Sequence, residues 1–345
     1  MNLQFTFNSL SNAPKNLVYR SLNKPLKPRW VVLAITDKCN SKCKHCNIWQ
    51  QKPTENPLSP DEIYKTLSSP LFNNVGIVMN TGGECSLRDD LYDVVMAEHN
   101  AIPKAHIIVS TNGLLPDRMI DIVQKLKEKD IHISIGTSLD GVGSAHDEMR
   151  GVPGNFKKVE KLIQALKDDD ITMGFVLSDL TTEYVSDYID YVKKQGKLPF
   201  IQWCNSSTFY MKDNPDPDRE KMLKIVNSLD PTYVGDLLLK NAWLRWLKGK
   251  DISFPCFAMQ TYCVLKCNGD IVPCLTKWDS KAGNVREDSI ENIWNSKQAE
   301  LTRIEIKKCK GCINSWGAGW SHSSAFFPYL QYLGHPKELW RRLQS

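Results

Sequence analysis

From residue 30 onward, short apolar runs alternate with stretches that have a helical period. The apolar runs have the length of strands and lie at 30–36, 75–80, 106–110, 131–138, 171–177 and 199–203. In the stretches between them, apolar residues recur every three or four positions, as on one face of a helix. The first of these stretches begins with Ser59 and has Glu62 three residues later, which is a capping box. Strict alternation predicts an α/β fold with a parallel sheet. Six units are fewer than the eight of a closed barrel, so we expect a partial (β/α)6 TIM-like barrel.

The regions around this barrel have a different character. Residues 1–29 contain three prolines and no clear period, and we expect an N-terminal extension there. The barrel itself is predicted over 30–217 and a helical linker over 218–250. Residues 251–320 form a second module with a hairpin signal, in which Asn268-Gly269 marks the turn. The tail, 321–345, is aromatic and basic and is predicted to be a final helix or flap.

Composition and charge exclude several classes of protein. Lys and Arg exceed Asp and Glu by only five in 345 residues, without a dense basic block, which argues against a nucleic-acid partner. The first residues lack the charged start and apolar run of a secretion signal. No apolar run approaches the roughly 20 residues that span a bilayer. We therefore expect a cytoplasmic protein without a membrane partner.

Cysteine use points to metal chemistry. Eleven cysteines are present, clustered at 39–46 and from 256 to 312, and outside a secreted protein such clusters indicate metal ligands before disulfides. Cys39, Cys43 and Cys46 follow the first strand directly, so they lie at the mouth of the barrel where barrel enzymes do their chemistry. Three thiolates can hold three irons of a [4Fe–4S] cluster and leave the fourth iron open. A zinc site completed by His45 is the alternative.

The spacing C-x3-C-x2-C resembles that of the radical S-adenosylmethionine (radical SAM) superfamily. In that family the methionine part of SAM binds the open iron, and reductive cleavage of SAM gives a 5′-deoxyadenosyl radical that abstracts hydrogen from an unactivated C–H bond. Gly82, Gly83 and Glu84 after the second predicted strand match the family's GGE motif. Glycines let a backbone come close to a ligand. The resemblance implies that this motif contacts the SAM amino group.

Further SAM contacts are implied at the same mouth. Thr111 and Asn112 end the third predicted strand, Ser138 ends the fourth, and the resemblance places Arg150 near the SAM carboxylate. His45 stands where family members usually carry an aromatic or apolar residue near the adenine. Two alternatives stay open: Ser138 as a helix or turn cap, and His45 as a solvent-facing loop residue.

The second module carries its own cysteine pattern. C-x12-G-x4-C runs from Cys256 through Gly269 to Cys274, and Cys309-x2-Cys312 follows. This resembles the first half of the SPASM domain, an auxiliary iron–sulfur module. Because no cysteine follows Cys312, the pattern favours the shortened twitch form. The resemblance then implies one auxiliary [4Fe–4S] cluster, held by Cys256, Cys274, Cys309 and Cys312. Cys263 and Cys267 are interpreted as buried thiols, although either could replace one of these ligands.

These features predict a radical SAM oxidoreductase whose auxiliary cluster accepts an electron in a net two-electron oxidation. Only 29 residues precede the first strand, which favours a small polar metabolite, sugar-like or cyclitol-like, over a peptide. The alternative is a maturase that modifies or cross-links a peptide or protein side chain. A non-catalytic zinc-binding interaction module is the alternative of another class. An electron donor such as flavodoxin or ferredoxin is expected. Candidates for a catalytic base follow predicted strand ends: Asp140, Asp179, Tyr210 and Asp213.

Overall fold

The six predicted strands are present and form one parallel sheet. The computed structural model describes residues 15–204, 207, 217–235, 237–252, 255–309 and 313. The strands are β1 (Trp30–Thr36), β2 (Ile77–Gly82), β3 (His106–Thr111), β4 (Ile133–Ser138), β5 (Ile171–Leu177) and β6 (Phe200–Trp203). Each pairs in parallel with the next in chain order, as in a partial barrel. This confirms the fold class that the alternation predicts.

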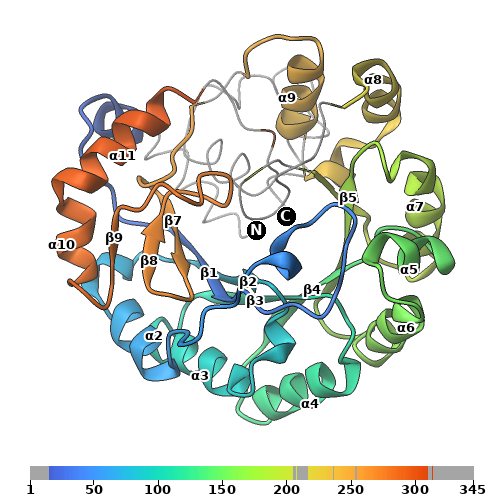
Figure 1. Cartoon of the computed structure of the whole chain (residues 1–345), viewed down its shortest axis with the longest axis horizontal. Coiled ribbons are helices and arrows are strands. Elements are labelled where there is room, and N and C mark those ends of the chain that lie inside the picture. Colours follow the sequence, from blue (N-terminus) through green and yellow to red (C-terminus); the bar gives the residue numbers. More distant parts are fainter. Residues whose placement is uncertain are drawn as a thin grey trace.

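Helices connect the strands and cover the outside of the curved sheet (Figure 1). They are α2 (Pro60–Leu67), α3 (Leu91–Ala101), α4 (Pro116–Lys127), α5 (Ser144–Arg150), α6 (Asn155–Ala165) and α7 (Val185–Lys194). Helix α2 begins with the predicted capping box: the Ser59 hydroxyl accepts from the Glu62 N–H, and the Glu62 carboxylate accepts from the Ser59 N–H. Short 3-10 helices lie at Ile48–Gln50, Pro70–Phe72, Cys85–Leu87, Thr182–Tyr184 and Pro231–Val234.

Residues 218–250, predicted as a helical linker, contain α8 (Arg219–Ser228) and α9 (Leu237–Leu247). Asp218 caps α8 by accepting from the N–H groups of Glu220 and Lys221. In the part of the chain that is described, no helix is long and apolar enough to cross a membrane.

The second module continues the sheet of the barrel. Strand β7 (Tyr262–Lys266) pairs in parallel with β1. Strand β8 (Asp270–Val272) pairs antiparallel with β7, and β9 (Gly283–Asn284) pairs antiparallel with β8, which gives a nine-stranded sheet. Helices α10 (Ile290–Asn295) and α11 (Lys297–Lys307) lie beside these strands (Figure 1). The sequence predicts the β7–β8 hairpin but not its pairing with the barrel. The boundaries drawn between barrel, linker and module stay a prediction.

Strand β1 is buried on both faces, because it lies in the middle of this sheet. Its outward residues Val31, Leu33 and Ile35 join the core between sheet and helices. Its inward residues Trp30, Val32 and Ala34 pack instead on Tyr262, Val264 and other residues of the second module. The second module therefore fills the β1 side of the barrel interior.

Across β3, β4 and β5 most of the inward positions carry small side chains, although Ile108 and Val176 also face the interior. Period-two alternation puts bulky residues on the helix side of these strands and small or polar ones inside. Those that face the interior cavity include Ser110, Ser134, Gly136, Ser138, Thr172 and Gly174. These short side chains leave space inside the barrel.

Candidate active site

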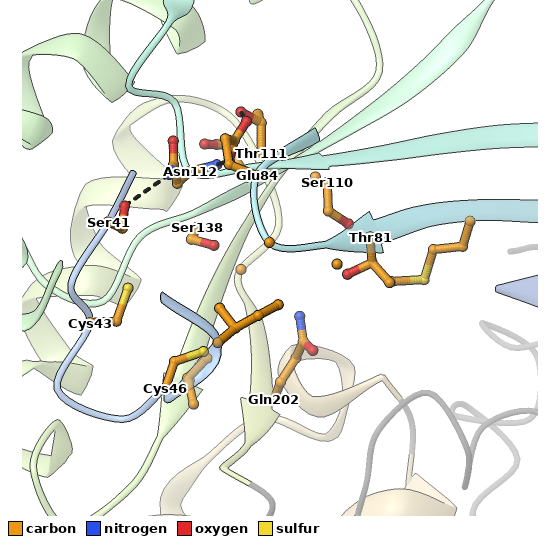
Figure 2. A pocket seen from close by; sticks show the side chains of 18 of the residues that line it. Ser41, Cys43, Cys46, Thr81, Glu84, Ser110, Thr111, Asn112, Ser138 and Gln202 are labelled. Carbon is orange, nitrogen blue, oxygen red and sulfur yellow. Dashed lines mark hydrogen bonds between the residues drawn. The ribbon is translucent and has the colours of Figure 1, made fainter. Parts of the chain in front are cut away.

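A cavity of about 520 Å³ lies inside the barrel and reaches the loop that follows β1. Figure 2 shows Cys43 and Cys46 on one side of it, with Gln202 nearby and Glu84, Thr111 and Asn112 grouped on another side. The cavity wall contains most of the residues that the sequence singled out: Cys39, Cys43, His45, Cys46, Gly82, Gly83, Glu84, Thr111, Asn112, Ser138 and Arg150. The fold thus brings the cysteine loop and the predicted SAM contacts together.

The three cysteines lie on the loop that follows β1 and form part of the cavity wall. Burial raises the pKa of Cys39 to about 11 and that of Cys46 to about 12. Both thiols are therefore protonated near neutral pH, and a metal cluster that binds them displaces their protons. Among the described residues, no three Cys, His, Asp or Glu side chains surround a position for a single ion.

Gly82 and Gly83 hold the cysteine loop against β2. The N–H of Gly83 donates to the carbonyl of Thr36 at 2.7 Å, and the N–H of Glu84 donates to the carbonyl of Lys38 at 2.8 Å. A Cβ atom on either glycine would lie 2.0 Å from one of these two carbonyl oxygens. Glycine is therefore required at both positions because the two backbone segments approach so closely, whether or not the motif also contacts a ligand.

The Glu84 carboxylate is buried and fully engaged. It accepts from the Thr111 hydroxyl at 2.7 Å, from the Asn112 N–H at 2.6 Å and from the Ser86 N–H at 3.0 Å. The Asn112 side-chain amide donates in turn to Asn40 and Ser41 of the cysteine loop, both at 2.8 Å. Glu84, Thr111 and Asn112 thus form one hydrogen-bond network that fixes the loop.

Arg150, at the end of α5, contacts the cysteine loop directly. Its Nη1 donates to Cys43 Sγ at 3.3 Å, and its Nη2 lies 2.9 Å from Asp140 Oδ2. Burial acts to lower the pKa of Arg150, but Asp140 and Cys43 together outweigh it and raise that pKa. The guanidinium is therefore always charged. His45 Nε2 lies 3.7 Å from the same Asp140 oxygen, so this histidine is a buried wall residue and not a solvent-facing one.

Behind Asp140 lies a polar chain that sequence reasoning missed. The Asp140 N–H donates to His146 Nδ1 at 3.2 Å, so His146 Nε2 carries the proton and donates to Asn155 Oδ1 at 3.0 Å. The Asn155 amide donates to the Asn112 carbonyl at 3.2 Å. Burial first, and then the charge of Arg150, lower the pKa of His146 to about 4, so it is neutral at physiological pH. The chain connects the ends of β3 and β4.

The base candidates are placed as follows. Asp140 is fully buried, is paired with Arg150 and does not line the cavity. Asp179 accepts from the Asp218 N–H at 3.1 Å and is likewise absent from the cavity wall. Tyr210 and Asp213 lie outside the described residues, as does Cys312. The choice of a base therefore stays a prediction.

Several cavity residues escaped the sequence analysis, among them Ser41, Thr81, Gln202 and Thr276. A signal was present for part of this wall. Small residues alternate along β4 as Ser134, Gly136 and Ser138, and a central barrel strand that faced a packed interior would carry bulky residues there. Gln202 and Thr276 have no such signal, because nothing local marks a strand or loop residue as facing a cavity.

Three of the predicted auxiliary ligands lie near one another. Burial raises the pKa of Cys274 to about 11, with a further contribution from Cys256, and burial and then Cys256 raise the pKa of Cys309. All three cysteines pack on the inner cluster that contains Tyr262 and Val264.

Cys263 instead belongs to the core on the opposite face of β7. Cys267 follows β7 and lies 3.6 Å from Asp37 Oδ2 and 3.5 Å from Thr54 Oγ1.

Comparison with known families agrees with this arrangement. Residues 33–194 match the family model described as the radical SAM superfamily, and residues 256–313 match the SPASM model, described as an iron–sulfur cluster-binding domain. The chain is a radical SAM enzyme with a C-terminal SPASM-type domain. Iron–sulfur clusters and SAM are therefore its cofactors. The first model covers the barrel with Cys39, Cys43 and Cys46, and the second covers all four predicted auxiliary ligands.

Individual relatives extend over both domains. The sporulation killing factor maturation protein SkfB of Bacillus subtilis is 24% identical over 81% of this chain and 68% of its own length. The antilisterial bacteriocin subtilosin biosynthesis protein AlbA of the same organism is 29% identical over 78% of this chain and 60% of its own length. The chain therefore spans about two thirds of these relatives. Among solved structures, Streptococcus suis SuiB bound to precursor peptide SuiA shares 20% identity, with a TM-score of 0.64 over 89% of this chain and 76% of SuiB. This last similarity concerns the fold.

The residues of the cavity fit these cofactors. Three thiols line one wall, which suits a cluster whose fourth iron is left to a small ligand. Arg150 Nη2 is paired with Asp140, but Arg150 Nε is buried and has no hydrogen-bond partner among the described residues, so it can donate to a carboxylate. Ser138 faces the same space and offers a hydroxyl group.

Proposed function

We propose that this protein is a radical SAM maturase that modifies or cross-links a side chain of a peptide or protein substrate. The observation that carries the proposal is the similarity to SkfB and AlbA, which extends over about four fifths of the chain. SkfB is named as a maturation protein and AlbA as a bacteriocin biosynthesis protein. SuiB, which shares the fold, has a precursor peptide bound. The comparisons thus favour the peptide alternative over the small polar metabolite that the sequence analysis preferred.

The cavity can hold a cofactor and part of a substrate together. With cluster and SAM bound, reductive cleavage supplies a carbon-centred radical that takes a hydrogen atom from an unactivated C–H bond. Such a site must exclude water. Beyond the cysteine loop, the wall is mostly neutral, with hydroxyl groups from Thr81 and Ser110, the Gln202 amide and apolar residues such as Ile108 and Val176. A neutral wall of this kind suits a substrate side chain with few charges.

Named residues have proposed roles in holding SAM. Arg150 would receive the carboxylate of its methionine part, because its guanidinium is buried at the cavity wall beside Cys43. The GGE motif, Thr111 and Asn112 would border the amino group, and His45 with Ser138 would lie near the nucleoside. Glu84 already accepts hydrogen bonds from Thr111, Asn112 and Ser86, so it acts mainly by fixing the geometry of this wall.

The second domain is proposed to carry one auxiliary cluster, held by Cys256, Cys274, Cys309 and Cys312. Four thiolates would close this cluster to substrate and leave it as an electron carrier, accepting the electron that a two-electron oxidation releases. A flavodoxin or ferredoxin is proposed as the electron donor. Tyr210 and Asp213 remain candidates for the base that removes the proton.

The test begins with enzyme purified and reconstituted without oxygen, then given SAM and a chemical reductant. Formation of 5′-deoxyadenosine in the wild type, and its loss in a variant with Cys39, Cys43 and Cys46 all replaced by alanine, are expected. A colourless protein that contains zinc and no iron would favour the non-catalytic module instead.

Substrate class is tested with two deuterated panels, one of candidate precursor peptides and one of sugars and cyclitols. Transfer of deuterium into 5′-deoxyadenosine from a peptide, together with a mass change of that peptide, is the expected result. Deuterium transfer from a sugar or cyclitol, with none from any peptide, would return the assignment to metabolite oxidation.

A further inference from the structure

One of the three cluster cysteines receives a hydrogen bond from a buried arginine. Arg150 Nη1 donates to Cys43 Sγ at 3.3 Å, and both residues are only 6% exposed. The backbone at the end of α5 also binds the cysteine loop. The Lys42 N–H donates to the Arg150 carbonyl and the Lys44 N–H donates to the Met149 carbonyl, both at 3.0 Å. The guanidinium is thus tied to the loop on which Cys43 lies.

Asp140 fixes the other end of this guanidinium. Its Oδ2 lies 2.9 Å from Arg150 Nη2, while its Oδ1 accepts from the Val176 N–H at 2.8 Å. Its own N–H donates to His146. Held by β5 and by α5, with no exposed surface, this carboxylate has little freedom to move. It therefore limits the rotamers that Arg150 can adopt.

A hydrogen bond to a ligand sulfur and a nearby positive charge both favour the more negative, reduced form of an iron–sulfur cluster. Both effects are strong where water is excluded. We propose that Arg150 raises the reduction potential of the SAM-binding cluster through Cys43, and that Asp140 is the positioning residue that keeps the guanidinium on this sulfur. The cluster gains one electron from the external reductant, and Arg150 makes that gain easier.

This inference rests on the proposed cluster at Cys39, Cys43 and Cys46, and the experiment separates the two. The cluster is followed by its electron paramagnetic resonance signal in the dithionite-reduced holoenzyme. Its signal is the one that changes when SAM is added and that disappears in the triple alanine variant. If wild-type enzyme has no such signal, the proposed function fails. If the signal is present, the inference is tested by a redox titration without SAM.

The decisive variants are Arg150→Gln, which removes the charge, and Arg150→Lys, which keeps the charge and loses the planar fork. Both are expected to lower the midpoint potential, Gln more than Lys. For Gln the expected change in the ratio of reduced to oxidised cluster at fixed potential is about tenfold, which is about 59 mV for one electron. The matched control is Arg88→Lys. Arg88 is also a buried arginine paired with an aspartate, but it donates to the Ile35 and Leu58 carbonyls.

Equal potentials in wild type and in both Arg150 variants, at equal iron content, would overturn the role of Arg150. So would an equal shift in the Arg88 control, because the effect would then not depend on Cys43.

The role of Asp140 is tested by a double-mutant cycle on the same potential. If Asp140 acts through Arg150, the shift caused by Asp140→Asn differs between the wild-type and Arg150→Gln backgrounds. If Asp140 is only another nearby charge, the two shifts are equal, and the positioning role is wrong. Should Asp140→Asn fail to load its cluster, Asp140→Glu is used in the same cycle, and the Arg150 variants still decide the main claim.

Discussion

Gly83 lies directly against the carbonyl oxygen of Lys38, so closely that a Cβ atom at this position would be 2.0 Å from that oxygen. The next residue, Glu84, donates its N–H to the same oxygen at 2.8 Å. Two segments that are distant in sequence, the cysteine loop and the end of β2, are thereby joined through backbone atoms alone. No side chain other than hydrogen fits between them.

Gly83→Ala is therefore expected to push the cysteine loop away from β2 and to abolish loading of the SAM-binding cluster. Iron and sulfide measured after anaerobic reconstitution should fall by about one [4Fe–4S] unit, and no SAM-dependent change of the electron paramagnetic resonance signal should remain. Gly136→Ala is the matched control, because a Cβ atom there meets only Ser110 Oγ, at 4.0 Å. Normal iron content in Gly83→Ala would show that the loop tolerates the displacement.

His146 is expected to make stability depend on pH in the acid range. Its pKa is about 4 in the folded protein and about 6.5 when unfolded, so the unfolded chain binds the extra proton first as pH falls. The stabilising contribution is complete above pH 6.5 and is lost between pH 6.5 and 4, by at most about 3 kcal/mol. His146→Gln should remove this part of the pH profile in urea unfolding, while His132→Gln, at an exposed site, should leave it unchanged.

Glu98 is expected to make stability depend on pH with the opposite sign. It is fully buried on α3, where burial raises its pKa to about 8, and its main partner is the Asn80 amide at 2.8 Å. The unfolded chain ionises this group near pH 4.5 and the folded protein does not, so stability falls as pH rises from about 4.5 to 8.

Glu98→Gln should therefore stabilise the protein at pH 8, by an amount on the order of a few kcal/mol, with little change at pH 4. Urea unfolding at both pH values measures this, and Asp93→Asn, on the exposed face of the same helix, is the control. A Gln variant less stable than the wild type at pH 8 would contradict the expectation.

Local patterns were sufficient to predict the barrel and insufficient to predict how the second domain joins it. Strands β1 and β5 appear in the sequence as mainly apolar runs of their observed length. Strand β1 is buried on both faces, as is typical of a central strand in a parallel sheet, whereas β5 buries alternate residues and turns the others towards the cavity. The pairing of β1 with β7 joins residues more than 200 positions apart. No periodicity records such a contact, so it was not predicted.

The same distinction applies to the site. The cysteine spacing and GGE could be recognised, because both are contiguous motifs. Asp140 was singled out as a candidate base, since an aspartate at a strand end is ambiguous in sequence. Its partner Arg150 is ten residues away on another element, and only the fold shows that they form a buried pair. His146 and Asn155 act through hydrogen bonds to backbone atoms, for which the sequence has no signal.

The cysteines of the second domain give the last prediction. Cys263 lies in the core between sheet and helices, next to its pairing partner Val31 on β1. Cys256, Cys274 and Cys309 pack on the other face of β7. A strand cannot present one side chain to both faces, so Cys263 cannot join those three without a rearrangement of β7. The Cys267 thiol lies instead beside the side-chain oxygens of Asp37 and Thr54, to which it can donate a hydrogen bond.

Cys263→Ala and Cys267→Ala should each keep the full iron content, about eight per chain if two [4Fe–4S] clusters are present. Cys263→Ala should cost about 1 kcal/mol of stability, because it removes a buried atom from the core. Cys274→Ala, the positive control, should lose about four irons while keeping the SAM-dependent signal of the other cluster. Iron analysis and visible absorption under anoxic conditions decide between these outcomes. Loss of one cluster's iron in Cys263→Ala or Cys267→Ala would make that cysteine a ligand and remove one of the four assigned here.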